Sequence, residues 1–308
     1  MNALIDIESK SLKLFGCLLG LIEMNRSIMK KKLAFFGLAI VVCLLWLSVQ
    51  TGSAFSKAKI EKEFHQTYAL AANGQLHLDN VNGKVRITGW DRAEVQVDAL
   101  KLGDTEAELD DVKIEIDSSS DRIRIHTKYP SSKWGLWKKN NSTTIEYDIK
   151  VPSQARLDEI KNVNGRIEIE RVHGSVHAST VNGKLMAEGL AADADLGSVN
   201  GAVEAAFEKF EGIKRVSVKT VNGRVALTLP TDANADISAH TLNGSIHSPD
   251  LAAKKHWPVG TDLHGTLGKG GAEIRAETVN GSIQMRRADA ARSASQPESR
   301  SKPKLENE

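Results

Sequence analysis

Hydrophobic and polar residues alternate at every second position in short runs along most of the chain. One run holds Val225, Leu227 and Leu229, and another holds Ile283 and Met285, with polar or small residues between them. This period of two predicts β-strands with one face in a core and the other face in water. In the first half of the chain the same pattern predicts strands over residues 85–87, 95–97, 112–116, 123–125 and 145–151. The sequence therefore predicts an all-β fold.

A four-residue phrase that ends in Asn-Gly recurs seven times between these runs. It begins with Asn, Thr or Ser, continues with Val or Leu, and is followed two positions after the glycine by an aliphatic residue. The copies end at Asn82-Gly83, Asn164-Gly165, Asn182-Gly183, Asn200-Gly201, Asn222-Gly223, Asn243-Gly244 and Asn280-Gly281. Asn-Gly is a strong turn signal because both residues tolerate a positive φ. Seven copies in one frame predict a repeat architecture in which these pairs are structural turns.

The spacing of the phrase leaves two arrangements. From Asn164 the next copies follow after 18, 18, 22, 21 and 37 residues, and the short steps fit two strands with a turn at each end. The first arrangement is an elongated β-solenoid, in which each step is one coil and the Asn side chains stack as a ladder. The second is a two-sheet antiparallel meander or sandwich with Asn-Gly hairpins. The recurrence of one identical phrase favours the solenoid, since stacked asparagines can bond the copies above and below.

The N-terminal region has the pattern of a targeting segment. Residues 33–49 are almost wholly apolar, residues 30–32 are lysines, and the small residues Gly52, Ser53 and Ala54 follow. This order predicts a secretory signal over residues 29–54, although the apolar run also reaches the short limit of a membrane anchor. Either reading places the following domain outside the cytoplasm, because the lysines stay inside. Since Met29 begins a conventional signal, we expect residues 1–28 to be an extension from an over-called gene start.

The remaining chain divides into three parts. Residues 59–160 contain a single repeat phrase and longer connections, so we expect them to cap the N-terminal end of the solenoid and protect its open strand edges. Residues 161–287 hold the regular β-repeat. Residues 288–308 are rich in Ser, Pro, Glu, Lys and Arg with Leu305 as the only large apolar residue, which predicts a disordered tail.

Charge and cysteine content exclude several functions. The chain holds 41 Lys and Arg against 39 Asp and Glu, but residues 1–54 carry 6 of the former and 3 of the latter. The mature part therefore has a net charge of −1, which argues against a nucleic-acid partner. Both cysteines, Cys17 and Cys43, lie in the N-terminal region. The mature domain consequently has no disulfide, no thiol catalysis and no zinc–cysteine site.

Several phrases together resemble one bacterial family. Beside the Asn-Gly copies, the phrases that carry the resemblance are those at residues 81–91, 147–152, 225–230 and 271–274. They resemble the adhesin-like β-strand-repeat domains of unknown function that are called toast-rack domains, over about residues 60–287. The resemblance implies an all-β repeat domain outside the cytoplasmic membrane and brings no catalytic residues. It also implies a sensing or scaffolding role for members that are encoded beside envelope-stress genes.

Two irregular connections hold the candidate ligand contacts. Trp134 and Trp137 lie among three lysines in the connection 129–141, and Trp257 lies in the connection 251–271. Exposed tryptophans stack on sugars or lie at a membrane interface, and lysines attract anionic glycans or lipid head groups. The alternative is that Trp134 and Trp137 fold back over the end of the solenoid, and that the connection around Trp257 is a plain surface excursion.

Other residues offer weaker candidates for chemistry. His173 and His177 are four residues apart, but Gly174 lies between them in a predicted turn and no metal-binding motif is present, so we predict no metal site and no cofactor. Asp110 and Asp111 could suggest a glycan-cleaving solenoid. Adjacent strand positions point to opposite faces, however, and we expect this pair in a solvated loop. With no catalytic motif in the chain, we predict no catalytic residues and no enzymatic activity.

These observations lead to a first functional hypothesis with two alternatives. The chain is predicted to be a non-enzymatic extracytoplasmic module, periplasmic or on the cell surface, for adhesion, binding or scaffolding at the cell envelope. Its expected partner is an envelope glycan, a membrane surface or a membrane protein. The first alternative is a membrane-anchored regulatory module in envelope-stress sensing. The second is a glycan-cleaving β-solenoid enzyme.

Overall fold

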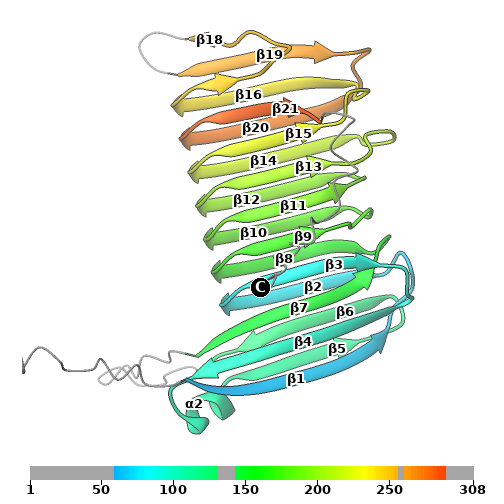
Figure 1. Ribbon diagram of the computed structural model, residues 1–308, viewed down its shortest axis with the longest axis vertical. Coiled ribbons are helices and arrows are strands. Elements are labelled where there is room, and N and C mark those ends of the chain that lie inside the picture. Colours follow the sequence, from blue (N-terminus) through cyan, green and yellow to red (C-terminus); the bar gives the residue numbers. More distant parts are fainter. Residues whose placement is uncertain (1–58, 131–142, 256–259, 289–308) are drawn as a thin grey trace, which may run out of the picture. The chain divides into compact units, whose positions relative to one another are not determined.

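The computed structural model describes residues 59–130, 143–255 and 260–288. Residues 58–308 form one compact unit, and the statements below concern its described part. This unit consists of two β-sheets, sheet A with 10 strands and sheet B with 11 strands (Figure 1). The segments expected as N-terminal extension, signal or anchor, and all of the expected tail except Ala288, lie outside the described residues.

Each repeat phrase ends a strand of sheet B, turns a corner and enters a strand of sheet A, which makes one coil. The coil strands of sheet B are β2 (Gln75–Asn82), β8 (Arg156–Asn164), β10 (Val176–Asn182), β12 (Ala194–Asn200), β14 (Arg215–Asn222), β16 (Ala235–Asn243) and β20 (Ala272–Asn280). Their successors in sheet A are β3 (Val85–Trp90), β9 (Ile167–Glu170), β11 (Leu185–Leu190), β13 (Val203–Phe207), β15 (Val225–Leu229), β17 (Ile246–His247) and β21 (Ile283–Arg287).

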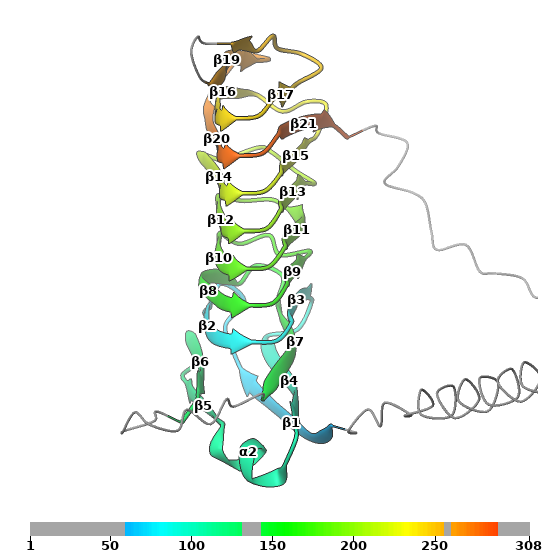
Figure 2. The ribbon, with the colours of Figure 1, turned by 90° about the vertical axis from the view of Figure 1, so that its left-hand side faces the viewer.

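Neighbouring coils pair in parallel in both sheets, and Figure 2 shows the two columns of strands joined at each coil. A hairpin would instead pair the strands on either side of each Asn-Gly antiparallel within one sheet. The solenoid prediction is therefore confirmed, and the alternative of an antiparallel meander is wrong.

The order of the coils in space differs from their order in the sequence. After β16 and β17 the chain reverses through β18 (Lys254–Lys255) and β19 (Thr261–Leu267), and β19 pairs antiparallel to β16. It then returns as β20 and β21, which lie between the coil of β14 and β15 and the coil of β16 and β17. This insertion explains the step of 37 residues between the last two phrases. At the other end, β2 and β3 stack on β8 and β9 although 82 residues separate their phrases.

The first half of the unit extends both sheets beyond the coil of β2 and β3. Sheet A continues with β7 (Thr144–Pro152), β4 (Glu94–Gly103) and β1 (Ile60–Ala69), and sheet B continues with β6 (Arg122–Lys128) and β5 (Lys113–Ser118). The pairs β1–β4, β4–β7 and β5–β6 are antiparallel. Four of the five strands predicted for this half lie at β4, β5, β6 and β7 and the fifth is β3, whereas β1 and β2 were not predicted.

The connection between β4 and β5 contains a short helix, α2 (Glu106–Asp111). The hydroxyl of Thr105 accepts a hydrogen bond from the Glu108 backbone N–H, which caps its first turn. Asp110 and Asp111 therefore belong to a helix, and the prediction of a solvated loop is wrong. Asp110 lies 2.8 Å from the ammonium nitrogen of Lys62 on β1.

The core lies between the two sheets and follows the alternation of the sequence. Val225, Leu227 and Leu229 are at most 1% exposed, as their period of two predicts. Tyr147 is the largest fully buried side chain, and its hydroxyl is 2.8 Å from the Thr127 hydroxyl. The aliphatic residues of successive coils thus stack on one another along the whole length of both sheets.

The asparagines of the seven corners form a continuous ladder of hydrogen bonds. The side-chain amide of Asn164 donates to the side-chain oxygen of Asn82 at 2.8 Å, and each further corner repeats this bond at 2.8–2.9 Å. In spatial order the members are Asn82, Asn164, Asn182, Asn200, Asn222, Asn280 and Asn243. This ladder explains why the same residue recurs at every corner, since an asparagine both donates and accepts.

A second ladder explains the first residue of the phrase, and the sequence analysis did not predict it. This side chain is buried, and in six of the seven phrases it donates to the glycine carbonyl of a neighbouring coil, as in Thr220 to Gly201 at 2.9 Å, whereas Asn80 donates to the Ile145 carbonyl at 3.3 Å. Equivalent bonds of 2.8–3.3 Å come from Asn162, Thr180, Ser198, Thr241 and Thr278. Only a residue that can donate satisfies that buried carbonyl, which is why Asn, Thr or Ser occupies the position.

The corner glycines are required by close approach more than by positive φ. Only Gly83 and Gly165 among them have φ in the left-handed range, at 125° and 151°, and no corner asparagine has a positive φ. At Gly223 a Cβ atom would lie 2.1 Å from the carbonyl oxygen of Gly201 in the neighbouring coil. The positive-φ explanation is therefore wrong for the other five corners. Their backbones stack too closely to admit a side chain.

We expect Gly223→Val to lower the free energy of unfolding by at least about 2 kcal/mol, because the new side chain must push two stacked corners apart. Urea unfolding monitored by circular dichroism measures this change. The matched control is Ala202→Val, one residue beyond a corner, where the neighbouring coils hold the larger Lys184 and Arg224. The control should stay within about 0.5 kcal/mol of wild type. Equal losses in both variants would contradict the close-approach account.

Candidate functional site

The three tryptophans predicted as ligand contacts, Trp134, Trp137 and Trp257, lie outside the described residues and stay predictions. The Asn-Gly corners make the contacts between coils that are given above. The outer face of sheet A holds a concavity that the sequence analysis did not predict.

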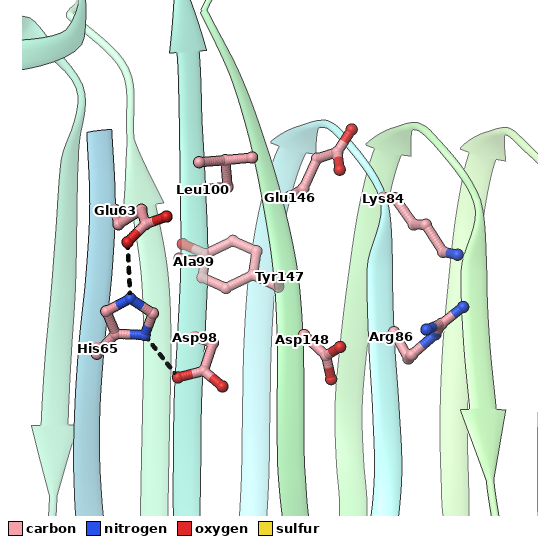
Figure 3. A pocket seen from close by; sticks show the side chains of 10 residues that line it. All are labelled: Glu63, His65, Lys84, Arg86, Asp98, Ala99, Leu100, Glu146, Tyr147 and Asp148. Carbon is pink, nitrogen blue, oxygen red and sulfur yellow. Dashed lines mark hydrogen bonds and ion pairs between the residues drawn. The ribbon is translucent and has the colours of Figure 1, made fainter. Parts of the chain in front are cut away.

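The concavity lies where β1, β4, β7 and β3 run side by side, and its volume is about 280 Å³ (Figure 3). Outward-facing positions of four strands supply its charged and apolar lining. These residues are Glu63 and His65 on β1, Asp98 and Leu100 on β4, Glu146 and Asp148 on β7, and Lys84 and Arg86 around the start of β3.

A row of charges crosses the four strands in register. His65 lies opposite Asp98, Asp98 lies opposite Asp148, and Asp148 lies opposite Arg86. His65 Nδ1 is 2.9 Å from Asp98 Oδ1, and Nε2 is 3.3 Å from Glu63 Oε2. The hydrogen bonds with Asp98 and then Glu63 raise the pKa of His65. The two aspartates face each other between a histidine and an arginine, so the wall of the concavity carries both signs of charge.

Leu100 makes the concavity different from the rest of this charged face. It points outward, is only partly buried, and lies between Glu63 and Glu146 in the cross-strand register. Most of the lining is charged, so Leu100 is the partly exposed aliphatic group that a ligand could cover. The lining has no hydroxyl or thiol beside His65, because the Tyr147 hydroxyl is turned into the core and bonded to Thr127.

A cluster of cations around Glu168 adjoins the concavity. Its carboxylate is 2.6 Å from Lys84 Nζ, 3.1 Å from Arg86 Nη2 and 3.2 Å from Arg166 Nη1. Burial by itself raises the pKa of Glu168, but the hydrogen bonds from these three cations outweigh it and lower the pKa to about 2. The carboxylate thus holds three cationic side chains in fixed positions on the face of sheet A.

Two further features of the face extend this charged surface. Glu204 lies 2.8 Å from Lys184 Nζ and 2.7 Å from Arg224 Nη2, and these bonds lower its pKa against the effect of burial. Trp90, at the end of β3, donates its indole N–H to the Glu94 carbonyl at 2.8 Å. Arg92 lies 4.9 Å from the centre of the indole ring, as expected for a cation–π contact.

The described residues show no arrangement for a metal or a membrane span. No three or more His, Cys, Asp or Glu side chains among them are placed to hold a metal ion. His173 has a carboxylate of Glu208 at 3.7 Å, while His177 lies on the outer face of sheet B. In the same part of the chain, no helix has the length and apolar character needed to cross a membrane.

The sequence profile of the Toastrack DUF4097 family matches residues 47–286. The chain belongs to this family. No curated protein matches it. The Toastrack chain is also similar to several solved structures, of which two are described next.

The first similar structure is a candidate cell adhesion protein from Clostridium sporogenes ATCC 15579, with 15% identity and a TM-score of 0.44 over 74% of this chain and 100% of that one. The second is a candidate adhesin from Bacteroides fragilis NCTC 9343, with 11% identity and a TM-score of 0.32 over 74% of this chain and 97% of that one.

The charge on Glu168 should make stability depend on pH. Its pKa in the folded protein, about 2, lies below the ordinary value of 4.5, so the ionised carboxylate stabilises the fold above pH 4.5 and this contribution disappears as the pH falls towards 2. We expect Glu168→Gln to lower the free energy of unfolding by roughly 2 kcal/mol at pH 7, since the side chain is only 11% exposed. Urea unfolding across this pH range measures the difference, which should close near pH 2. A constant difference at every pH would contradict the electrostatic cause.

Proposed function

We propose that this Toastrack chain is a non-enzymatic module that binds and scaffolds an envelope glycan outside the cytoplasm. The observation that carries the proposal is the concavity on sheet A, where Leu100 lies between the carboxylates of Glu63 and Glu146 and the cations Lys84 and Arg86 line the far side. All its charged groups except Lys84 stand on strands rather than loops, so their positions relative to one another are held by the sheet. A preorganised surface of this kind loses little conformational entropy on binding.

The composition of the concavity favours a glycan over an anionic membrane surface. Four carboxylates, of Glu63, Asp98, Glu146 and Asp148, line it, against the permanent cations Lys84 and Arg86. An excess of acidic groups repels anionic lipid head groups. Sugar hydroxyls, in contrast, both donate to carboxylates and accept from cations, and the aliphatic face of a sugar ring can cover Leu100.

The proposed location outside the cytoplasm rests on the sequence of the N-terminal segment. The apolar run 33–49 follows three lysines and precedes small residues, which supports export of the β-domain either as a secreted protein or on an anchor. A long repeat domain without a catalytic constellation among its described side chains fits a scaffold in that compartment.

The test is a sedimentation assay of purified residues 58–308 with peptidoglycan, outer-envelope glycans and anionic liposomes. We expect binding to a glycan preparation, and at least about tenfold weaker binding for Leu100→Ser, because the apolar floor is lost. The matched control is Met186→Ser, which removes an outward-facing side chain from sheet A away from the concavity.

Three results would contradict the proposal. Binding that Trp134→Ala/Trp137→Ala loses while Leu100→Ser keeps would move the contact to the connection 129–141. Binding to liposomes alone would replace the glycan by a membrane surface. An absence of binding to all three preparations would favour a protein partner and the regulatory role in envelope-stress sensing.

A further inference from the structure

The outer face of sheet B carries a charge pattern that is complementary to itself. One row of outward-facing residues crosses all 11 strands in register, with β12 as the central strand. We call it the charged row. From β5 to β18 its members are Glu115, His126, Asp79, Lys161, Ser179, Gly197, Lys219, Glu277, His240, Asp262 and Lys254.

The charged row pairs opposite charges when it is folded about Gly197 on the central strand. Residues at equal distances from the centre then match as acid with base, or as acid with histidine. The four matched pairs are Glu115 with Lys254, His126 with Asp262, Asp79 with His240, and Lys161 with Glu277. The remaining pair, Ser179 with Lys219, contains no like charges.

A straight row of exposed aliphatic side chains runs beside the charged row. We call it the valine row. Its members in spatial order are Val81, Val163, Val181, Val199, Val221, Val279 and Leu242, and all but the half-buried Val81 are 38–43% exposed. Threonine has a similar β-propensity and would suit an outward position. The charged row beside the valine row is indeed polar throughout apart from Gly197. An exclusively aliphatic row therefore marks a surface that contacts another surface.

We propose that sheet B is the interface of a symmetric dimer of this chain. The two-fold axis runs parallel to the strands and passes over β12, midway between two facing sheets. This rotation reverses the order of the strands and keeps each row opposite its own copy. The valine rows then pack on one another, with Val199 facing its copy, and the charged rows meet with their opposite charges paired.

The other in-plane axis gives the opposite result. A two-fold axis along the direction of coil stacking would place every strand opposite its own copy. With that axis over the charged row, Lys161 would face Lys161 and Glu277 would face Glu277, and like charges in an interface cost several kcal/mol. Opposed charged rows therefore favour the axis parallel to the strands.

The middle of the interface has room for close approach. Ser179 and Gly197 occupy the charged row beside the axis, and the only heavy atom near a Cβ on Gly197 would be the Ser179 Cβ at 4.0 Å. One group opposes the dimer. Asp195 lies two residues before Gly197 on β12 and would meet its own copy at the axis. Asp195→Asn should therefore tighten the dimer.

The area of the proposed interface reaches the size expected of a biological contact. The charged row on eleven strands about 4.8 Å apart spans about 48 Å, the valine row on seven strands spans about 29 Å, and each row is about 7 Å wide along the strands. The footprint is on the order of 500 Å² on each partner, or about 1,000 Å² in total. In this dimer the two concavities on sheet A stay free on the outer faces, so the inference goes beyond the proposed binding function and does not depend on it.

The test is the mass of residues 58–308 in sedimentation velocity at micromolar concentration; this unit holds every core residue of the described chain, so it can be studied without the N-terminal segment. We expect a dimer for wild type. Lys161→Glu and Glu277→Lys should each weaken it at least about tenfold, because each homodimer then contains two like-charge pairs.

Mixing the two variants distinguishes pairing from misfolding. In a heterodimer of Lys161→Glu with Glu277→Lys, both contacts again join one acidic and one basic side chain, so the mixture should form dimers although each variant alone does not. A second disrupting variant is Val199→Lys, and its control is Thr228→Lys on the outer face of sheet A, which should remain dimeric. A monomeric wild type, or a mixture that stays monomeric, would overturn the proposal.

Discussion

The fold depends on the close stacking of its corners. A glycine backbone in one coil lies so near the next that no Cβ fits at Gly223, and the buried hydroxyl of Thr220 donates to the glycine carbonyl of the same neighbouring coil. On the solvent side of each corner, the asparagine side chains form hydrogen bonds with those of the neighbouring coils. Each coil thus bonds its neighbours through backbone, buried side chain and exposed amide together. Since these bonds hold the coils in register, they also align every row of outward side chains on both sheets.

This alignment turns the two faces of the solenoid into surfaces with different properties. On sheet A, antiparallel strands β1 and β4 join β7 and β3 and bring opposite charges around Leu100. On sheet B, eleven strands present a charged row and a valine row across the same register. One face is suited to a ligand with hydroxyl groups and the other to a second copy of itself. A dimer through sheet B would carry two sheet A sites, which raises the apparent affinity for a polymer with repeated binding units.

Much of the fold could be predicted because its signals are local. The alternation placed the strands around Val85, Ile149 and Val225, and the recurring Asn-Gly phrase predicted stacked coils. The predictions failed where a contact between distant residues decides the outcome. The corner glycines, for example, are required by the neighbouring coil rather than by their own φ. The helix that contains Asp110 was missed for another reason, since its cap at Thr105 is a local signal that went unrecognised. The candidate tryptophans stay untested, and the concavity was missed because its outward residues come from four separate stretches of sequence.

The sequence by itself determined most of the strand pattern, the recurrence of the coils and the residue at each corner, because a period of two and an Asn-Gly pair act within a few neighbouring residues. Only the tertiary structure decided two features of the spatial order. The last coil in the sequence, β20 and β21, lies between the two coils that precede it in the sequence, and β2 stacks on β8 although 82 residues separate their phrases. Closing a longer loop costs only slightly more entropy, so chain order does not dictate spatial order. The two faces follow from this spatial order, since it sets which charges become neighbours.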